Sequence, residues 1–217
     1  MRPARGTVEA RKRQVTEPLL TFDGFRIGHI LEELTLYGAT SVKMLPENLR
    51  SSLLVEAEGY SYRPEPETVG SGESVVHQQM ETFEDFPPKS RFWVLRDALQ
   101  QTLARSLAEV APYPFESPLD LNAMVLHKYD QGSLSITPHR DRLIYVNLIL
   151  IIVLGGRGRF CVCADQSGRE SREINAPPGN AIFLRAPGFS VAPERAFHYV
   201  TDIRESRYVL GLRQPKP

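Results

Sequence analysis

The sequence has few of the features that mark secreted or membrane-spanning proteins. It has only two cysteines, Cys161 and Cys163, which lie two positions apart on an expected strand, a poor arrangement for an unstrained disulfide. No apolar run reaches the roughly 18 residues needed to cross a bilayer, and the longest, 143–154, is interrupted by Asn147. We therefore expect reduced thiols, a cytoplasmic location and no membrane association.

An excess of charge of either sign is also lacking. Lys and Arg together number 26, as do Asp and Glu, so the formal net charge is zero. This balance gives no global electrostatic reason to expect nucleic acid, a membrane surface or an acidic partner, although a local basic patch is compatible with it. The 217 residues, 41% of them hydrophobic, are enough for one domain with a substantial core.

The N-terminal part reads as a tail followed by helices. Residues 1–18 are basic without periodicity, and no apolar segment follows that would make them a secretory signal, so we expect a disordered tail. Residues 19–45 leave strands and a short helix both open. Apolar residues at helical spacing predict helices over 46–58 and 90–110.

A loop and a strand are expected between these helices. Residues 60–74 are polar and rich in Gly and Pro, which predicts a long loop that either forms a lid or is simply mobile. Residues 74–83 have strand character. His77, Gln78, Gln79 and Met80 on that strand are candidate substrate contacts, and an ordinary surface strand explains them equally well.

From residue 121 the pattern changes to short strands. A glycine-rich turn is expected at 155–158, and the predicted strands are 123–129, 145–154, 159–164, 173–176, 181–184, 197–201 and 207–213. Helices followed by many short strands favour an α+β fold with a β-sandwich or jelly-roll C-terminal half. We expect a single domain over 19–217, with a helical part at 19–120 and a β-rich core at 121–217.

The sequence His139-Arg140-Asp141 is the strongest chemical signal. On an extended backbone His139 and Asp141 point to the same side, which makes them two adjacent ligands for a divalent metal. A second histidine from a distant strand would complete a 2-His-1-carboxylate triad, which leaves open positions on Fe(II). Taken alone, the motif is more often a solvated turn than a metal site. Arg140, on the opposite strand face, is expected to be structural.

His198 is the candidate for the third ligand. It is the only histidine after Asp141, and a jelly roll brings such a strand back beside an earlier one. It also shares a face with apolar residues, which is usual for a histidine satisfied within the core. His77 and His127 are the competitors for this role.

Two arginines near the C-terminus complete the pattern. Arg207 and Arg213 are six positions apart, so one strand face carries both. Val209 and Gly211 share that face and are small and apolar, as expected for the floor of a pocket. There, an arginine offers a planar fork to a carboxylate. An ordinary half-exposed strand is the alternative.

Together these motifs resemble the catalytic core of Fe(II)- and 2-oxoglutarate-dependent dioxygenases over about 121–214. The arrangement is most similar to the AlkB-like branch, whose C-terminal signature is Arg-x5-Arg. The resemblance is carried by Tyr129 and Gly132, His139-x-Asp141, His198 and Arg207-x5-Arg213. It implies a double-stranded β-helix, or jelly-roll, core with N-terminal helices packed on it.

The resemblance also implies roles for individual residues. His139, Asp141 and His198 would be the iron ligands. Arg207 would pair with the distal carboxylate of 2-oxoglutarate, to which Tyr129 would donate a hydrogen bond. Arg213 would lie near the keto-acid end of 2-oxoglutarate or steady Asp141.

Two positions depart from the AlkB-like pattern. His127 stands where the branch usually has Asn, and it is therefore a candidate co-substrate contact of a different kind. Val209 also replaces a frequent Asn. The related prolyl-hydroxylase-like branch shares the metal motif but usually pairs the distal carboxylate with Lys. The presence of Arg207 at this position argues against that branch.

The function expected from this resemblance is oxidation of a C–H bond. Fe(2+) would be bound at the site, and 2-oxoglutarate and O2 would be consumed there with release of succinate and CO2. The substrate would be hydroxylated or oxidatively demethylated. A small molecule, a protein side chain and an alkylated nucleic acid all stay open as the substrate, and so does the oligomeric state. The alternatives are a non-catalytic jelly-roll module that binds a small acid, and a cupin-like enzyme with another metal.

Overall fold

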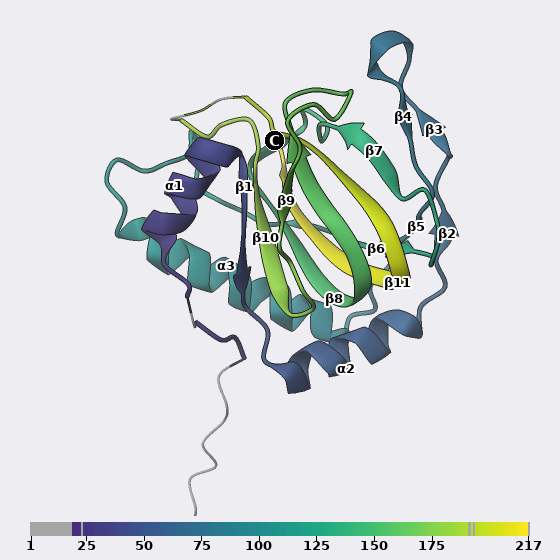
Figure 1. Cartoon of the computed structure of the whole chain (residues 1–217). Coiled ribbons are helices and arrows are strands. Elements are labelled where there is room, and N and C mark those ends of the chain that lie inside the picture. Colours follow the sequence, from purple (N-terminus) through teal and green to yellow (C-terminus); the bar gives the residue numbers. More distant parts are fainter. Residues whose placement is uncertain (1–18, 23, 191, 193, 217) are drawn as a thin grey trace, which may run out of the picture.

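The structure is a computed structural model of the whole chain, and it describes residues 19–22, 24–190, 192 and 194–216 (Figure 1). The tail expected at 1–18 lies outside the described residues. None of the helices in the described part is long and apolar enough to cross a membrane. Cys161 and Cys163 both carry free thiols.

The described residues form three α-helices and one short 3-10 helix. They are α1 Ile27–Tyr37, α2 Glu47–Glu58, α3 Arg91–Ala108 and the 3-10 helix Gly72–Ser74. α2 and α3 confirm the two helices expected from apolar spacing. The segment whose type the sequence left open contains α1 and then β1.

Local signals explain where these helices begin and end. The Ser90 side chain accepts a hydrogen bond from the backbone N–H of Phe92, which caps the N-terminus of α3. The last residue of α1 is followed by Gly38 with φ 78°, a left-handed conformation that glycine adopts at little cost. Gly38 thereby turns the chain directly into β1.

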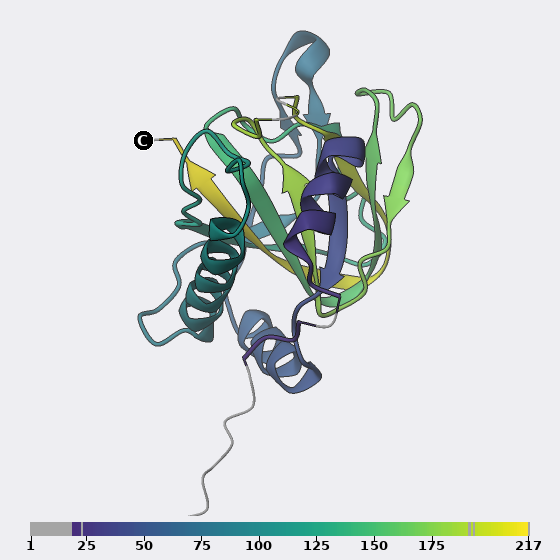
Figure 2. The same ribbon diagram turned by 90° about the vertical axis from the view of Figure 1, so that its left-hand side faces the viewer.

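The strands form one large sheet and one small hairpin, and every pair is antiparallel. Their bounds are β1 Ala39–Lys43, β2 Arg63–Pro64, β3 Thr68–Val69, β4 Val76–His77, β5 Glu81–Phe83, β6 Ala123–Tyr129, β7 Ile136–His139, β8 Tyr145–Cys163, β9 Arg172–Ile174, β10 Asn180–Arg185 and β11 Phe197–Pro215. The β3–β4 hairpin projects from the body of the molecule in both overall views (Figures 1 and 2).

The large sheet is folded into two layers, because β8 and β11 each run through both. The first half of β8 and the second half of β11 pair with β10 and β6, and β1, β5 and β2 extend this layer. The second half of β8 and the first half of β11 pair with β9 and β7. This is the jelly-roll core with helices packed on it that the sequence predicted.

Two expectations about this core were wrong. The predicted turn at 155–158 is part of the continuous strand β8, and the predicted strands 197–201 and 207–213 are parts of β11. The glycines still mark a change of direction, since Gly156 has φ 80° and the register between β8 and β11 shifts nearby. Pairing with β11 keeps the backbone hydrogen-bonded through this bend, so no loop forms.

The segment before α3 also differs from expectation. The region expected as a loop, 60–74, contains β2 and β3, and the strand expected at 74–83 is divided into β4 and β5. The division lies at Gln78, whose backbone N–H donates to Glu67 O at 2.8 Å and which forms an isolated bridge with Ile136. The chain therefore passes from the hairpin to the edge of the large sheet.

Two hydrophobic clusters hold these layers. One lies between the helices and the sheet and includes the fully buried Phe92 and Leu99 of α3, and Figure 2 looks onto the side that α1 and α3 cover. The other lies between the two layers and includes Tyr129, Phe160 and Val209. Burying a side chain the size of Phe92 stabilises the fold by about 1.5–3 kcal/mol.

Candidate active site

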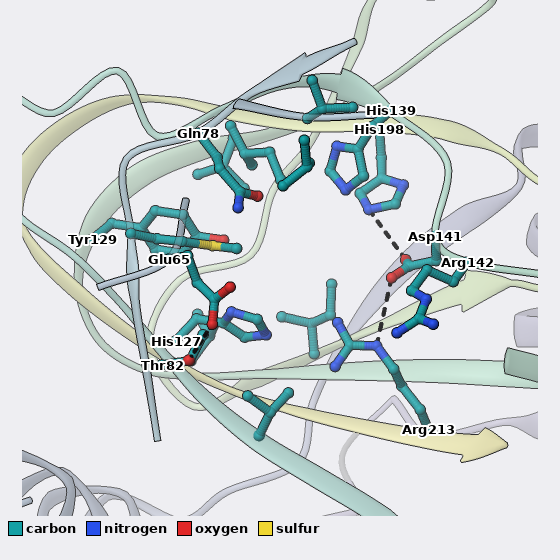
Figure 3. Close-up of a pocket in the computed structure, with 18 of the residues that line it drawn as sticks. Glu65, Gln78, Thr82, His127, Tyr129, His139, Asp141, Arg142, His198 and Arg213 are labelled. Atoms are coloured by element: carbon teal, nitrogen blue, oxygen red, sulfur yellow. Dashed lines mark hydrogen bonds and ion pairs between the residues drawn. The ribbon is translucent and has the colours of Figure 1, made fainter. Parts of the chain in front are cut away.

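A pocket of about 320 Å³ lies between the two layers of the jelly roll. It is lined by β6 and the second half of β11 on one layer and by β7 and the first half of β11 on the other. β5 and the segment around β2 close one side (Figure 3). Every residue that the sequence singled out as a metal ligand or co-substrate contact lines it: His127, Tyr129, His139, Asp141, His198, Arg207 and Arg213.

The two histidines and the aspartate come together as the His-x-Asp spacing predicted. β7 ends at His139 and pairs with β11 so that His139 lies opposite His198, and their ring centroids are 4.3 Å apart. Asp141 follows β7 outside the strand, and its Oδ2 lies 3.3 Å from Nε2 of His198. Two ligands bound at right angles to one metal at about 2.1 Å would be about 3 Å apart.

Backbone carbonyls fix how the two imidazoles present their nitrogens. Nδ1 of His139 lies 2.9 Å from Thr137 O, and Nδ1 of His198 lies 3.4 Å from Ala196 O. A carbonyl only accepts hydrogen bonds, so each Nδ1 carries the proton and each Nε2 keeps its lone pair. Carbonyls that hold Nδ1–H in this way are the usual second-shell partners of metal-binding histidines.

The protonation states suit metal binding as well. Burial lowers the pKa of His139, and burial together with His139 lowers the pKa of His198 to about 4, so both rings are neutral near pH 7. For Asp141 burial raises the pKa, but Arg213 and the histidines outweigh it and the net pKa is lowered. The site therefore offers two neutral imidazoles and one carboxylate.

The three side chains are near one another but are not yet arranged as a complete ligand set. Within the described residues, no group of three His, Cys, Asp or Glu side chains has its donor atoms gathered around one point. His198 contacts Asp141, whereas His139 contacts the ring of His198 and makes no ion pair with Asp141. The buried Oδ2 of Asp141 nevertheless has no hydrogen-bond partner, which fits a carboxylate oxygen that binds a cation.

Arg213 contacts the carboxylate of Asp141. Its Nε lies 3.5 Å from Oδ1 of Asp141, and both side chains are largely buried, with 13% and 15% of their surfaces exposed. Nε makes no hydrogen bond. Of the two positions that the resemblance allowed for Arg213, the structure has it beside Asp141.

Arg207 lies in the pocket with its charge uncompensated. It is 1% exposed, pairs through its backbone with Tyr129, and both terminal nitrogens of its guanidinium are buried without a hydrogen-bond partner. Burial lowers the pKa of Arg207, and burial raises the pKa of Tyr129. A protein seldom buries an unpaired guanidinium, so this pair fits an anionic ligand.

His127 also faces the pocket without partners. It lies opposite Val209 in β11, and both of its ring nitrogens are buried and make no hydrogen bond. Burial, followed by Arg213, lowers the pKa of His127 to about 3, so the ring is neutral near pH 7. One nitrogen is then a donor and the other an acceptor, both available to a bound molecule.

Of the four candidate substrate contacts, two line the pocket and two do not. Gln78 and Met80 line the pocket, but Gln79 is exposed and its Oε1 accepts from Leu134 N. His77 is also exposed, with Nδ1 3.2 Å from Thr68 Oγ1 outside the pocket lining.

Arg140 lies at the rim of the pocket with its guanidinium carbon 4.1 Å from the centre of the Phe197 ring. This contact anchors the side chain beside the metal motif, in keeping with the structural role expected for it.

Four further polar or charged residues of the pocket were missed from the sequence: Glu65, Thr82, Glu84 and Arg142. Met80, Thr82 and Glu84 alternate along β5 and the residues that flank it, so strand periodicity could have found Thr82 and Glu84. Glu65 belongs to a Pro-Glu repeat that reads as a loop, and no sequence signal marks it.

Comparisons with known proteins show which solved structures share this fold. Neither a protein-family model nor a curated protein sequence matches the chain. Among solved structures, a prolyl-4-hydroxylase from Pseudomonas putida matches with a TM-score of 0.57 and 16% identity, over 88% of this chain and 99% of the other.

A prolyl hydroxylase from Trichoplax adhaerens, in complex with a hypoxia-inducible-factor oxygen-degradation-domain peptide, matches with a TM-score of 0.64 and 10% identity, covering 87% and 88%. An oxidoreductase of the 2OG-Fe(II) oxygenase family from Burkholderia pseudomallei matches with a TM-score of 0.56 and 13% identity, covering 87% and 90%. The chain has the fold of these proteins. At this level of identity the likeness extends to the fold alone.

Proposed function

We propose that this protein is an Fe(II)- and 2-oxoglutarate-dependent oxygenase that hydroxylates a C–H bond of an organic substrate. The observation that carries the proposal is the buried, unpartnered guanidinium of Arg207 in the same pocket as His139, Asp141 and His198. A metal site and an anion site in one pocket are what a chelating dicarboxylic co-substrate requires. The fold shared with named oxygenases supports it.

In this proposal His139, Asp141 and His198 hold the metal. The Nε2 lone pairs of the two histidines and the ionised carboxylate of Asp141 would be the groups that bind it. Ferrous iron with 2-oxoglutarate, when bound, reduces O2 with release of succinate and CO2 and oxidises a nearby C–H bond. Arg213 holds Asp141 in place through the 3.5 Å contact with Oδ1.

Arg207 and Tyr129 hold the far end of the co-substrate. The guanidinium offers two parallel N–H donors to a carboxylate, and the Tyr129 hydroxyl lies on the neighbouring strand at the same register. The raised pKa of Tyr129 keeps this hydroxyl a donor. His127 can donate one further hydrogen bond to the co-substrate from β6, in place of the amide that AlkB-like proteins usually carry there.

Hydroxylation is favoured over demethylation by analogy. Two of the similar structures are named prolyl hydroxylases, and one of them is bound to a peptide. We therefore propose a carbon atom of a protein side chain or a small molecule as the site of reaction, ahead of an alkylated base. The Arg-x5-Arg pair is the one feature that favours the AlkB-like branch. Two free thiols favour a cytoplasmic location.

Replacing a metal ligand separates this function from a non-catalytic binding module. His139→Ala should abolish Fe(II) binding in equilibrium dialysis and should abolish succinate formation from 2-oxoglutarate in air. His29→Ala, which changes an exposed histidine of α1, is the matched control and should change neither. Normal iron binding by His139→Ala, or succinate formation at the wild-type rate, would contradict the proposal.

A further inference from the structure

One wall of the pocket carries hydrogen-bond acceptors that the proposed reaction does not use. In Figure 3, Glu65 and Gln78 lie on one side of the cavity and His198 and Asp141 on the other. Glu65 comes from the segment after β2, where its backbone N–H donates to Met80 O at 3.0 Å. Its carboxylate therefore projects from an edge of the large sheet into the pocket.

Glu65 is a carboxylate without a cation. Oε1 accepts a hydrogen bond from Thr82 Oγ1 at 2.5 Å, and within the described part of the chain Glu65 makes no ion pair. Its neighbours differ in this respect, since Glu84 pairs with Arg63 at 3.7 Å and Glu81 pairs with the Lys128 ammonium at 2.7 Å. Thr82 thus orients Glu65 but leaves its charge uncompensated.

Gln78 presents a second acceptor, and its orientation is fixed. The side chain is 5% exposed, and its Nε2 donates to Pro66 O at 2.9 Å. One N–H of the amide is engaged there and the second is left available, and the acceptor Oε1 has no hydrogen-bond partner among the described residues. This oxygen is accessible rather than fully buried, so it can accept a hydrogen bond from a ligand that donates one.

The same pocket also has an apolar part to its lining. Val76, Met80 and Ile136 line it. Four arginines also line the pocket, and none of them pairs with Glu65 in the described part of the chain. Arg213 contacts Asp141, Arg140 stacks on Phe197, and Arg207 is the proposed partner of the co-substrate carboxylate. Arg142 lies beside Asp141 (Figure 3). A ligand with a cationic end and an alkyl arm matches this distribution of charge and apolar surface.

The surface next to Glu65 is acidic as well. A second cavity of about 320 Å³ shares Glu65 and Met80 with the lining of the first. Its charged lining consists of Glu65, Glu67, Glu81, Asp130 and Lys128. The Lys128 ammonium is held by Glu81 at 2.7 Å and Asp130 at 3.1 Å, so the carboxylates of this cavity outnumber its cations.

We infer that Glu65 and Gln78 form a subsite for the ammonium or guanidinium group of the substrate. The alkyl arm of that substrate then extends over Val76, Met80 and Ile136 toward His139 and His198. This inference rests on the proposed oxygenase function for its second half. The ion pair and the hydrogen bond anchor the cation, and the length of the arm selects the carbon that is oxidised.

The first test uses n-butylamine as the probe and apoprotein as the sample, so it does not depend on iron or 2-oxoglutarate. Near pH 7.5 an alkylamine is protonated, because its pKa lies close to the ~10.4 of lysine. Binding is followed by NMR titration of the backbone amides. We expect n-butylamine to bind at least tenfold more tightly than butyrate or 1-butanol, with shifts around Glu65 and Gln78.

Variants decide which residue is responsible. Glu65→Gln removes the charge and keeps the shape, and it should weaken n-butylamine binding at least tenfold. Glu65→Asp should weaken it less. Asp85→Asn changes an exposed carboxylate outside the pocket lining and should have no effect. Equal binding of butyrate, or unchanged affinity in Glu65→Gln, would overturn the inference.

The second test concerns the reaction and the source of the cation. Succinate release by the iron-loaded enzyme is measured with n-butylamine, with a lysine-containing peptide, and with that peptide acetylated on Nζ. Stimulation by the lysine peptide and not by its acetylated form indicates a polypeptide substrate, and stimulation by the amine indicates a small one. Stimulation by neither, with n-butylamine bound, would contradict the placement of the alkyl arm. Absence of any iron-dependent succinate would count against the oxygenase and leave the binding result standing.

Discussion

At the scale of single residues, Arg207 is the side chain whose surroundings most require a ligand. It is 1% exposed, and its two terminal nitrogens have no partner. An unpaired buried charge costs several kcal/mol, which a fold tolerates at a site where another molecule supplies the countercharge. The backbone of β11 fixes its position, because Arg207 and Tyr129 are paired across the sheet.

Removing this guanidinium should abolish tight binding of the co-substrate. Charge-assisted hydrogen bonds contribute about 1.5–3 kcal/mol each, so loss of two in Arg207→Ala should raise the Kd for 2-oxoglutarate at least about 100-fold. The measurement is calorimetric titration of 2-oxoglutarate into Mn(II)-loaded protein. Arg204→Ala, an exposed arginine of the same strand, is the control and should bind normally. A Kd in Arg207→Ala within threefold of wild type would show that the arginine serves another purpose.

Strand alternation predicted which face of β11 carries Arg207 and Arg213, and both line the pocket. His139, Asp141 and His198 line the same pocket, although Asp141 lies beyond the end of β7. Their roles as metal ligands stay predictions. Prediction from the sequence failed for Glu65, because the position of that side chain depends on how β2 pairs with β5. Two-residue strands next to proline carry no alternation from which such a pairing could be inferred.

At the scale of elements, the bend in β8 positions the pocket. Gly156 has φ 80°, and a Cβ there would collide with Ser206 O and lie 2.6 Å from the Cα of Arg207. β8 and β11 can approach this closely only because residue 156 has no side chain. The bend thus divides the sheet into two layers. It also fixes where the backbone of Arg207 lies relative to the pocket.

Gly156→Ala should therefore destabilise the protein and disturb the co-substrate site. A non-glycine residue at positive φ costs about 1–3 kcal/mol, and the backbone collision adds to it, so we expect a loss of at least about 2 kcal/mol in the free energy of unfolding. Urea denaturation measures this loss. Weakened 2-oxoglutarate binding by the folded variant should accompany it.

Gly28→Ala is the matched control. Gly28 lies within α1, and a Cβ there meets nothing within 4 Å. Alanine is favoured over glycine inside a helix by about 0.5–1 kcal/mol, so this variant should be as stable as wild type or more so. If the two glycine variants lost equal stability, the bend at Gly156 would not be the cause.

The helices were predictable and the long strands were not. Leu95, Leu99 and Leu103 repeat at helical spacing on α3, a signal contained within one segment. The continuity of β8 through Gly155–Gly158 depends on pairing with β11, about 50 residues later in the chain. A glycine cluster read locally predicts a turn, and only the distant partner strand decides otherwise.

At the scale of the whole molecule, the pocket joins the two layers of the jelly roll. His139 and His198 belong to one layer and Arg207 to the other, while β11 contributes to both. A metal bound by the first layer and a co-substrate bound by the second would therefore hold the layers together. Both ligands bind only the folded chain, which makes stability a readout of the site.

Metal and co-substrate together should raise the melting temperature. At ligand concentrations about 100-fold above Kd, each bound ligand stabilises the fold by about 2.7 kcal/mol, which corresponds to about 5–10 °C for a domain of this size. Thermal unfolding followed by circular dichroism with Mn(II) and 2-oxoglutarate measures the shift, and EDTA should reverse it. In Arg207→Ala the 2-oxoglutarate increment should disappear, and an increment equal to that of wild type would contradict the assigned site.

The most direct test of the whole account is an anaerobic titration of the apoprotein with Fe(II) and then 2-oxoglutarate, followed by visible absorption. A chelating 2-oxo acid on ferrous iron gives a metal-to-ligand charge-transfer band that neither component gives alone. We predict a band that requires both components and is lost in His139→Ala and in Arg207→Ala. Iron binding without a band would contradict the co-substrate mode, and absence of iron binding would contradict the metal site and the oxygenase function with it.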